Sequence, residues 1–88
     1  MKPQRLMQML EDIVANQAAL PRDEALETVV VHLQRFWAPP MRTRILAWHL
    51  ADGTGLSTLA DAALTQLRAR EQAGEPAPPT RRGASDAG

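Results

Sequence analysis

The stretch Phe36-Trp37-Ala38-Pro39-Pro40-Met41-Arg42 decides how this chain folds, because it ends one helical pattern and starts another. A residue before a proline is biased away from helical geometry, so the first of these two helices should end at Ala38. A proline suits the first turn of a helix, so the double proline should open the second one. Two of the three aromatic residues of the chain stand side by side at this corner. In a chain so poor in aromatic residues, such a pair either fixes a bend or binds another molecule.

The segment before the corner has the apolar spacing of an amphipathic helix. Asp23 is predicted as its N-cap, since a short acidic side chain can accept hydrogen bonds from the free backbone N–H groups. Trp37 falls near the centre of the apolar face and Phe36 at its edge. Trp37 is therefore predicted in the core, and Phe36 at a rim or a partner interface. The apolar residues recur at i, i+3, i+4, i+7 and i+11: Leu26, Val29, Val30, Leu33 and Trp37.

Three more helices are predicted around this one. The first covers about residues 4–20 and is ended by Pro21. The third runs from the double proline to about Asp52, where a glycine-rich turn follows. The fourth begins after Ser57, which is predicted as its N-cap, and ends before Gly74.

The predicted fold class is all-α: a small bundle of about four short helices with a Pro-Pro corner between the second and the third. Residues 1–72 are expected to form the helical domain. Residues 73–88 are rich in Pro, Gly and Ala and lack apolar periodicity, so they are expected to be a disordered tail. The chain has 88 residues and no cysteine, so one domain is expected, with no disulfide and no thiolate metal site.

Charge and hydropathy narrow the classes of partner. Ten basic residues balance ten acidic ones, which argues against nucleic acid as a partner. No window approaches the ~18 continuous apolar residues of a membrane span, so no membrane partner is expected. The N-terminal residues lack the apolar run of a signal peptide, and the expected localisation is cytoplasmic.

No group of side chains predicts a catalytic, cofactor-binding or metal site. His49 and Asp52 stand about one helical turn apart, but a zinc site needs further convergent ligands. Nothing in the sequence ties Asp61 to this pair. Ser57 has no base at a recognisable spacing and is explained as a helix cap. Three arginines near the corner can meet phosphate or carboxylate groups or can form a solvated face: Arg35, Arg42 and Arg44.

The third helix is apolar on two faces. At about 100° per residue, Met41, Ile45 and Trp48 share one face, and Leu46 and Leu50 lie nearly opposite that face. A helix that is apolar on both sides is normally covered on both, and in so small a chain the second cover can come from another molecule. The predicted partner interface is Phe36, Pro39, Pro40, Met41, Arg42, Arg44, Leu46 and Leu50. The predicted core includes Leu10, Ile13, Val30, Leu33, Trp37, Ile45 and Leu67.

Residues 36–42 carry the pattern Phe-Trp-x-Pro-x-Met-Arg directly after an amphipathic helix. Upstream lies Leu6-Met7-Gln8-Met9, and downstream Gly55-Leu56-Ser57 leads into a leucine-rich helix. In these features the chain resembles the delta subunit of soluble, NAD-dependent, molybdenum-containing formate dehydrogenases. The resemblance covers about residues 5–70 and leaves out the tail.

The resemblance implies a non-catalytic accessory subunit that binds the large catalytic subunit and supports assembly, cofactor insertion or stability. It implies no cofactor in this chain. The partner complex is expected to carry bis-molybdopterin guanine dinucleotide with Mo or W, iron–sulfur clusters and FMN, and to include beta and gamma diaphorase subunits. Two alternatives stay open, namely a transient maturation factor or adaptor for the catalytic subunit and a small helical DNA-binding regulator.

Overall fold

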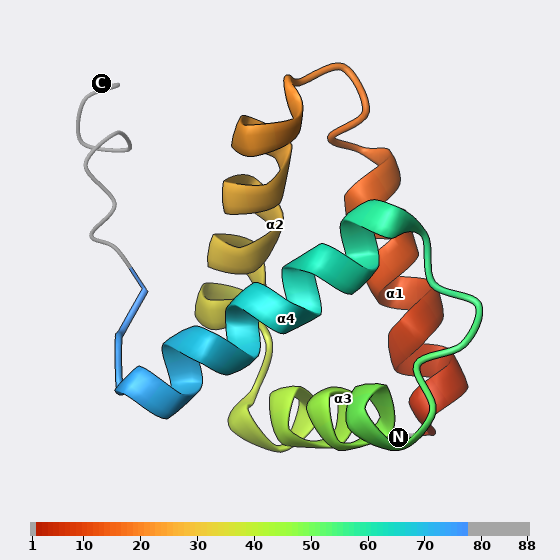
Figure 1. The fold of residues 1–88 in the computed structure, drawn as a ribbon, viewed down its shortest axis with the longest axis vertical. Coiled ribbons are helices and arrows are strands. Elements are labelled where there is room, and N and C mark those ends of the chain that lie inside the picture. The colour runs from red at the N-terminus through yellow and green to blue at the C-terminus, as the bar shows by residue number, and fades with distance from the viewer. Residues whose placement is uncertain (1, 78–88) are drawn as a thin grey trace.

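The computed structural model describes residues 2–77 (Figure 1). They form four helices: α1 (Pro3–Ala15), α2 (Arg22–Phe36), α3 (Pro39–Ala51) and α4 (Thr58–Ala73). No strand occurs within this range, and the predicted all-α fold class is confirmed. None of these helices is long and apolar enough to cross a bilayer. The predicted disordered tail falls mostly on residues 78–88, which lie outside the described residues.

The helix α4 holds the other three together. In Figure 1 it crosses in front of α1 and α2, while α3 runs below them. It packs against all three of the other helices, and α3 packs in addition against α1. The corner between α2 and α3 lies at the opposite end of α2 from the α1–α2 loop. One long side of α3 is therefore left without a covering helix.

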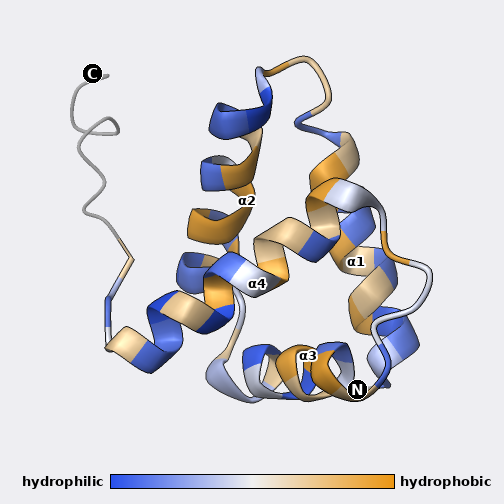
Figure 2. Ribbon diagram, in the orientation of Figure 1, coloured by the Kyte–Doolittle hydropathy of each residue, from blue (hydrophilic) through white to orange (hydrophobic). Residues whose placement is uncertain are grey.

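The core is formed by apolar residues from all four helices. The ribbon in Figure 2 marks the hydrophobic stretches of each helix in orange. Six of the residues predicted in the core are buried: Leu10, Val30, Leu33, Trp37, Ile45 and Leu67. The seventh, Ile13, is partly buried and packs against the cluster from its edge. The remaining buried residues come from α1, α2 and α4: Leu6, Ala25, Val29, Ala60, Ala63 and Leu64.

Proline geometry produces the corner between α2 and α3. Trp37 and Ala38 are extended, with ψ of 133° and 147°, because each lies outside a helix and Ala38 precedes a proline. Pro39 and Pro40 occupy the first turn of α3, where a missing backbone N–H costs no hydrogen bond. The Arg42 side chain then closes the corner, since its Nη1 donates to the carbonyl oxygen of Trp37 at 2.6 Å.

Two helix ends differ from the sequence predictions. The first helix ends at Ala15, well before Pro21, and tighter i to i−3 hydrogen bonds follow, such as that from Gln17 N to Val14 O. No large apolar side chain between Val14 and Leu20 is available to hold another turn on the core. The prediction of Asp23 as N-cap is wrong. The N-cap is Pro21, two residues earlier, because the Pro21 carbonyl already accepts from Ala25 N at 2.9 Å.

Side-chain and glycine caps fix both ends of α4. Ser57 Oγ accepts from Ala60 N at 3.2 Å, which confirms the predicted N-cap. The same hydroxyl donates to Glu11 Oε1 at 2.8 Å, and Ser57 N donates to Glu11 Oε2 at 2.7 Å. The helix ends at Gly74, whose φ of 74° is the left-handed geometry that glycine adopts without strain. Glu11 thus ties α1 to the start of α4.

Candidate partner-binding surface

Large apolar side chains are exposed at three places in residues 2–77. Phe36 is 70% exposed at the end of α2, and Leu50 is 73% exposed near the end of α3. Leu20, in the α1–α2 loop, is 39% exposed. Two of the three thus flank the outer side of α3. Isolated exposed apolar residues are common on proteins, so the exposure of these two does not by itself indicate a binding surface.

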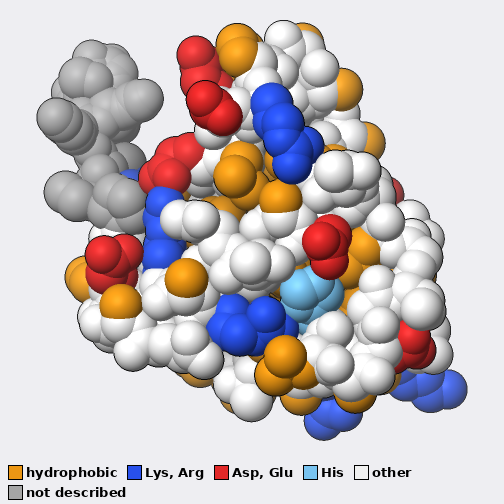
Figure 3. Space-filling view, in the orientation of Figure 1, with side chains coloured by type: hydrophobic (Ala, Val, Ile, Leu, Met, Phe, Trp, Pro, Cys, Tyr) orange, Lys and Arg blue, Asp and Glu red, His pale blue; other side chains and the backbone are white. Residues whose placement is uncertain are grey.

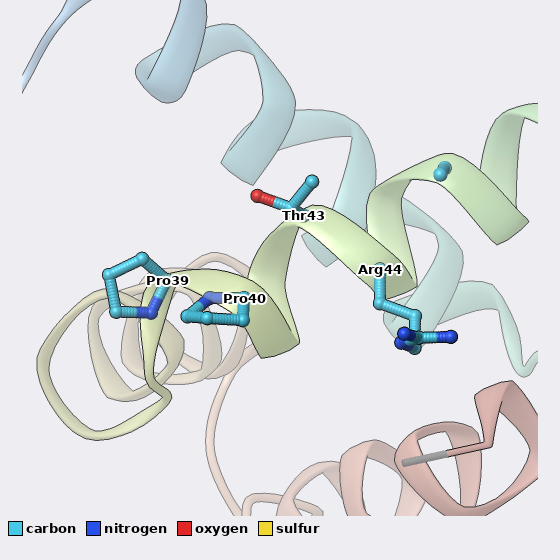
Figure 4. Close-up of a pocket in the computed structure, with 5 residues that line it drawn as sticks. Pro39, Pro40, Thr43 and Arg44 are labelled. Carbon is cyan, nitrogen blue, oxygen red and sulfur yellow. The ribbon is translucent and has the colours of Figure 1, made fainter.

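The surface between them is a shallow hollow along the outer side of α3. Pro39, Pro40, Thr43, Arg44 and Ala47 line an open space of about 550 Å³ (Figure 4). All five are exposed. The lining of the hollow is mainly carbon, from two proline rings, one alanine and one threonine methyl group.

Helical geometry places Leu50 on the same side as this hollow. At about 100° per residue, Thr43, Ala47 and Leu50 lie within about 60° of one another. Phe36 lies three residues before Pro39, which limits the distance between their Cα atoms to about 11 Å. We call this set the corner surface: Phe36, Pro39, Pro40, Thr43, Arg44, Ala47 and Leu50.

Arg44 borders a second, smaller space. Leu6, Pro40, Met41 and Arg44 line a crevice of about 110 Å³ where α1 meets α3. Arg44 makes no hydrogen bond and no ion pair with any other part of residues 2–77. Its guanidinium therefore lies between two mainly apolar hollows with all of its donors free toward solvent.

Three residues of the predicted interface also make contacts within the chain. Met41 and Leu46 are half-buried and pack against the core. Arg42 Nε donates to Glu71 Oε2 at 2.7 Å, in addition to the bond that its Nη1 makes at the corner. Its side chain is 17% exposed. Arg42 thus links the end of α2 to α4 and has little surface left for a partner.

The aromatic pair divides between inside and outside. Trp37 is 5% exposed and belongs to the core. Phe36 points away from it and packs against the ring of His32, with centroids 4.9 Å apart and planes tilted by 47°. This contact orients Phe36 on the surface without covering it, as its 70% exposure shows.

The face that carries α4 is different, because its charged side chains are paired. Arg70 binds Glu27 and the Gln34 side chain, which joins α4 to α2. Figure 3 views this side of the molecule and shows basic and acidic side chains next to one another. Beside Arg42 and Glu71, a crevice of about 370 Å³ is lined largely by such polar groups and by the residues that follow α4.

His49 takes part in this paired face. Its Nε2 lies 2.7 Å from Asp61 Oδ1, and Arg68 Nη2 lies 2.9 Å from its Nδ1. Because a guanidinium can only donate, Nδ1 accepts, and the neutral ring carries its hydrogen on Nε2 and donates it to Asp61. Arg68 Nη2 also donates to the Leu46 carbonyl at 3.2 Å. Both ring nitrogens are therefore engaged, and the group serves to join α3 to α4.

The sequence missed Asp61 and Arg68 as partners of His49, and Thr43 and Ala47 as part of the corner surface. The first two lie 12 and 19 residues from His49, so only the packing of α3 on α4 brings them together. The other two could have been found from the helical period, since they lie between Pro40 and Leu50 on one side of α3.

Within residues 2–77, no three His, Cys, Asp or Glu side chains converge as a metal site would require.

The fold and this surface define a small all-α protein in which Phe36 and Leu50 are strongly exposed at the two ends of the outer side of α3. A family model matches residues 5–64, which is more than half of the chain, and is described as the NADH-dependent formate dehydrogenase delta subunit FdsD. The chain belongs to this family, and the predicted resemblance is confirmed. The match takes in the whole corner surface. No curated protein and no solved structure gives a match.

Proposed function

We propose that this chain is a non-catalytic accessory subunit of a cytoplasmic NAD-dependent formate dehydrogenase and that it binds the large catalytic subunit through the corner surface. In this role it supports assembly, cofactor insertion or stability of the complex. The redox cofactors are carried by the partner subunits of the complex, which include the beta and gamma diaphorase subunits. These cofactors are bis-molybdopterin guanine dinucleotide with Mo or W, iron–sulfur clusters, and FMN. One observation carries the proposal, namely that the most exposed large apolar side chains flank one hollow inside the family-matched segment.

The energetics of burial support binding at this surface. Burying a Phe or Leu side chain that was exposed gains about 1.5–3 kcal/mol each. Phe36 and Leu50 are the two side chains with most to gain, since they are 70% and 73% exposed. The same residues contribute little to the fold, so binding can use them without destabilising the chain.

The test is co-purification of the full-length chain with the large catalytic subunit. The double variant Phe36→Ala/Leu50→Ala should lose the large subunit and reduce formate oxidation by the assembled complex. Leu20→Ala is the matched control, because it removes an exposed leucine at the opposite end of α2 and should co-purify normally. Co-purification of the double variant at the wild-type level would overturn the proposal.

Native mass spectrometry of the mature complex separates a subunit from a transient factor. A subunit should be present in a fixed ratio to the large catalytic subunit. Its absence from active, cofactor-loaded enzyme would favour the maturation factor, which binds the same partner and then leaves.

A further inference from the structure

The charges on α3 are one-sided. The helix carries Arg42 and Arg44 and has no Asp or Glu anywhere in its sequence. Arg42 is paired with Glu71 within the chain. Arg44 is the one that remains free within residues 2–77, and it lies on the corner surface. A carboxylate that pairs with Arg44 would therefore come from outside the described part of the chain.

The surroundings of Arg44 distinguish it from an ordinary surface arginine. Its side chain contributes to the walls of both the 550 Å³ hollow and the 110 Å³ crevice, whose other linings are mostly apolar. An arginine set in apolar surface is a common anchor of protein interfaces. The planar guanidinium can bind a carboxylate through two parallel hydrogen bonds, and these bonds strengthen where the surrounding surface excludes water.

We propose that the corner surface receives an apolar segment of the large catalytic subunit and that an Asp or Glu beside that segment pairs with Arg44. This inference rests on the proposed function and adds the chemistry of the bound segment. The apolar side chains fill the hollow over Thr43 and Ala47, and the carboxylate lies at its edge on the guanidinium. A small free anion does not fit this surface as well, because it leaves the apolar hollow and the exposed Phe36 and Leu50 in water.

Charge reversal tests the pairing. The dissociation constant of the full-length chain for the large catalytic subunit is measured by calorimetry for wild type, Arg44→Glu and Arg22→Glu. Arg22 is an exposed arginine at the far end of α2 and serves as the matched control. Arg44→Glu should weaken binding at least about tenfold, since like charges then face each other. Arg22→Glu should stay within about twofold, and circular dichroism melts of both variants should match wild type.

The outcomes separate this inference from the proposed function. If Arg44→Glu binds as wild type while Phe36→Ala/Leu50→Ala does not bind, the carboxylate pairing is overturned and the proposed function stands. If all variants bind as wild type, the surface itself is wrong and both fail. If the wild-type chain does not bind the large catalytic subunit, the proposed function fails and the inference fails with it.

A cross-link identifies the partner carboxylate directly. The chain has a single lysine, Lys2, so Arg44→Lys adds one amine at the corner surface. A carbodiimide then joins that amine to any carboxylate in contact with it, with loss of one water. The expected product is a cross-link, absent from the wild-type chain, to an Asp or Glu that stands next to apolar residues in the large catalytic subunit. Failure to find any variant-specific cross-link in a complex that still forms would overturn the inference.

Discussion

The face around α4 and the outer side of α3 carry similar residues but use them differently. Around α4, each arginine is held by named partners, as Arg68 is by His49 and Arg70 by Glu27. On the outer side of α3, Arg44 has no partner within residues 2–77, and the residues around it are small or apolar. The same contrast holds for the aromatic pair, since Trp37 is buried and Phe36 is exposed. One side of the molecule thus builds the fold, and the other is left free for binding.

The aromatic pair gives the largest expected difference. Trp37→Ala removes a side chain that is 5% exposed and should lower the free energy of unfolding by about 3–5 kcal/mol. Phe36→Ala, one residue earlier, should lower it by about 0.5 kcal/mol or less, since little contact is lost. Urea titration followed by circular dichroism measures both. Equal losses of unfolding free energy for the two variants would show that Phe36 also supports the fold.

The two arginines of α3 should show the next largest difference in their contribution to the free energy of unfolding. Arg42→Ala loses the bonds to the Trp37 carbonyl and to Glu71, and should cost about 1–3 kcal/mol of unfolding free energy. Arg44→Ala should change the same quantity by about 0.5 kcal/mol at most. Thermal melts of the two variants at equal concentration provide the measurement. A melting temperature for Arg42→Ala equal to that of wild type would remove its role in closing the corner.

The link between α1 and α4 should have a moderate effect. Ser57→Ala removes both the cap on Ala60 N and the hydroxyl that donates to Glu11, and should cost about 1 kcal/mol. Ser57→Thr keeps the hydroxyl and should restore most of this loss. The same urea titration checks the pair, and a threonine variant as unstable as the alanine variant would argue against the cap as the cause.

The His49 group should have the smallest effect on stability. Asp61→Asn exchanges the charge of a side chain that is 60% exposed, so the free energy of unfolding should change by less than about 1 kcal/mol. The ring should nevertheless show the Nε2–H tautomer in ¹⁵N NMR spectra at neutral pH. An Nδ1–H tautomer would contradict the bond from Arg68 to Nδ1.

The parts of this structure that depend on nearby residues could be predicted from the sequence, and the parts that depend on distant ones could not. The double proline and the helical period were sufficient to place the corner and to separate Trp37 from Phe36. The roles of Arg42 and Glu11 were not predictable, because their partners lie 29 and 46 residues away. Arg42 and Arg44 look equivalent in the sequence, and only the packing of α4 decides which of them is paired.

The start of α2 shows that the exact end of a helix could not be predicted either, even though it depends on nearby residues. Asp23 was predicted as N-cap from its side chain alone, but Pro21 is the N-cap, so α2 starts two residues earlier. Asp23 still lies in the first turn, where its charge favours the positive end of the helix dipole. The preference of Asp for helix starts thus identified the right region but the wrong N-cap residue.

Hydroxyl-radical footprinting of the chain, free and bound to the large catalytic subunit, tests directly whether the corner surface is the binding site. It needs no substitution, because Phe36, Leu50 and Leu20 are all exposed in the free chain and report from two ends of the molecule. We predict that the oxidation rates of Phe36 and Leu50 fall several-fold in the complex while that of Leu20 stays unchanged. Unchanged rates at Phe36 and Leu50 in a complex that has formed would contradict the account.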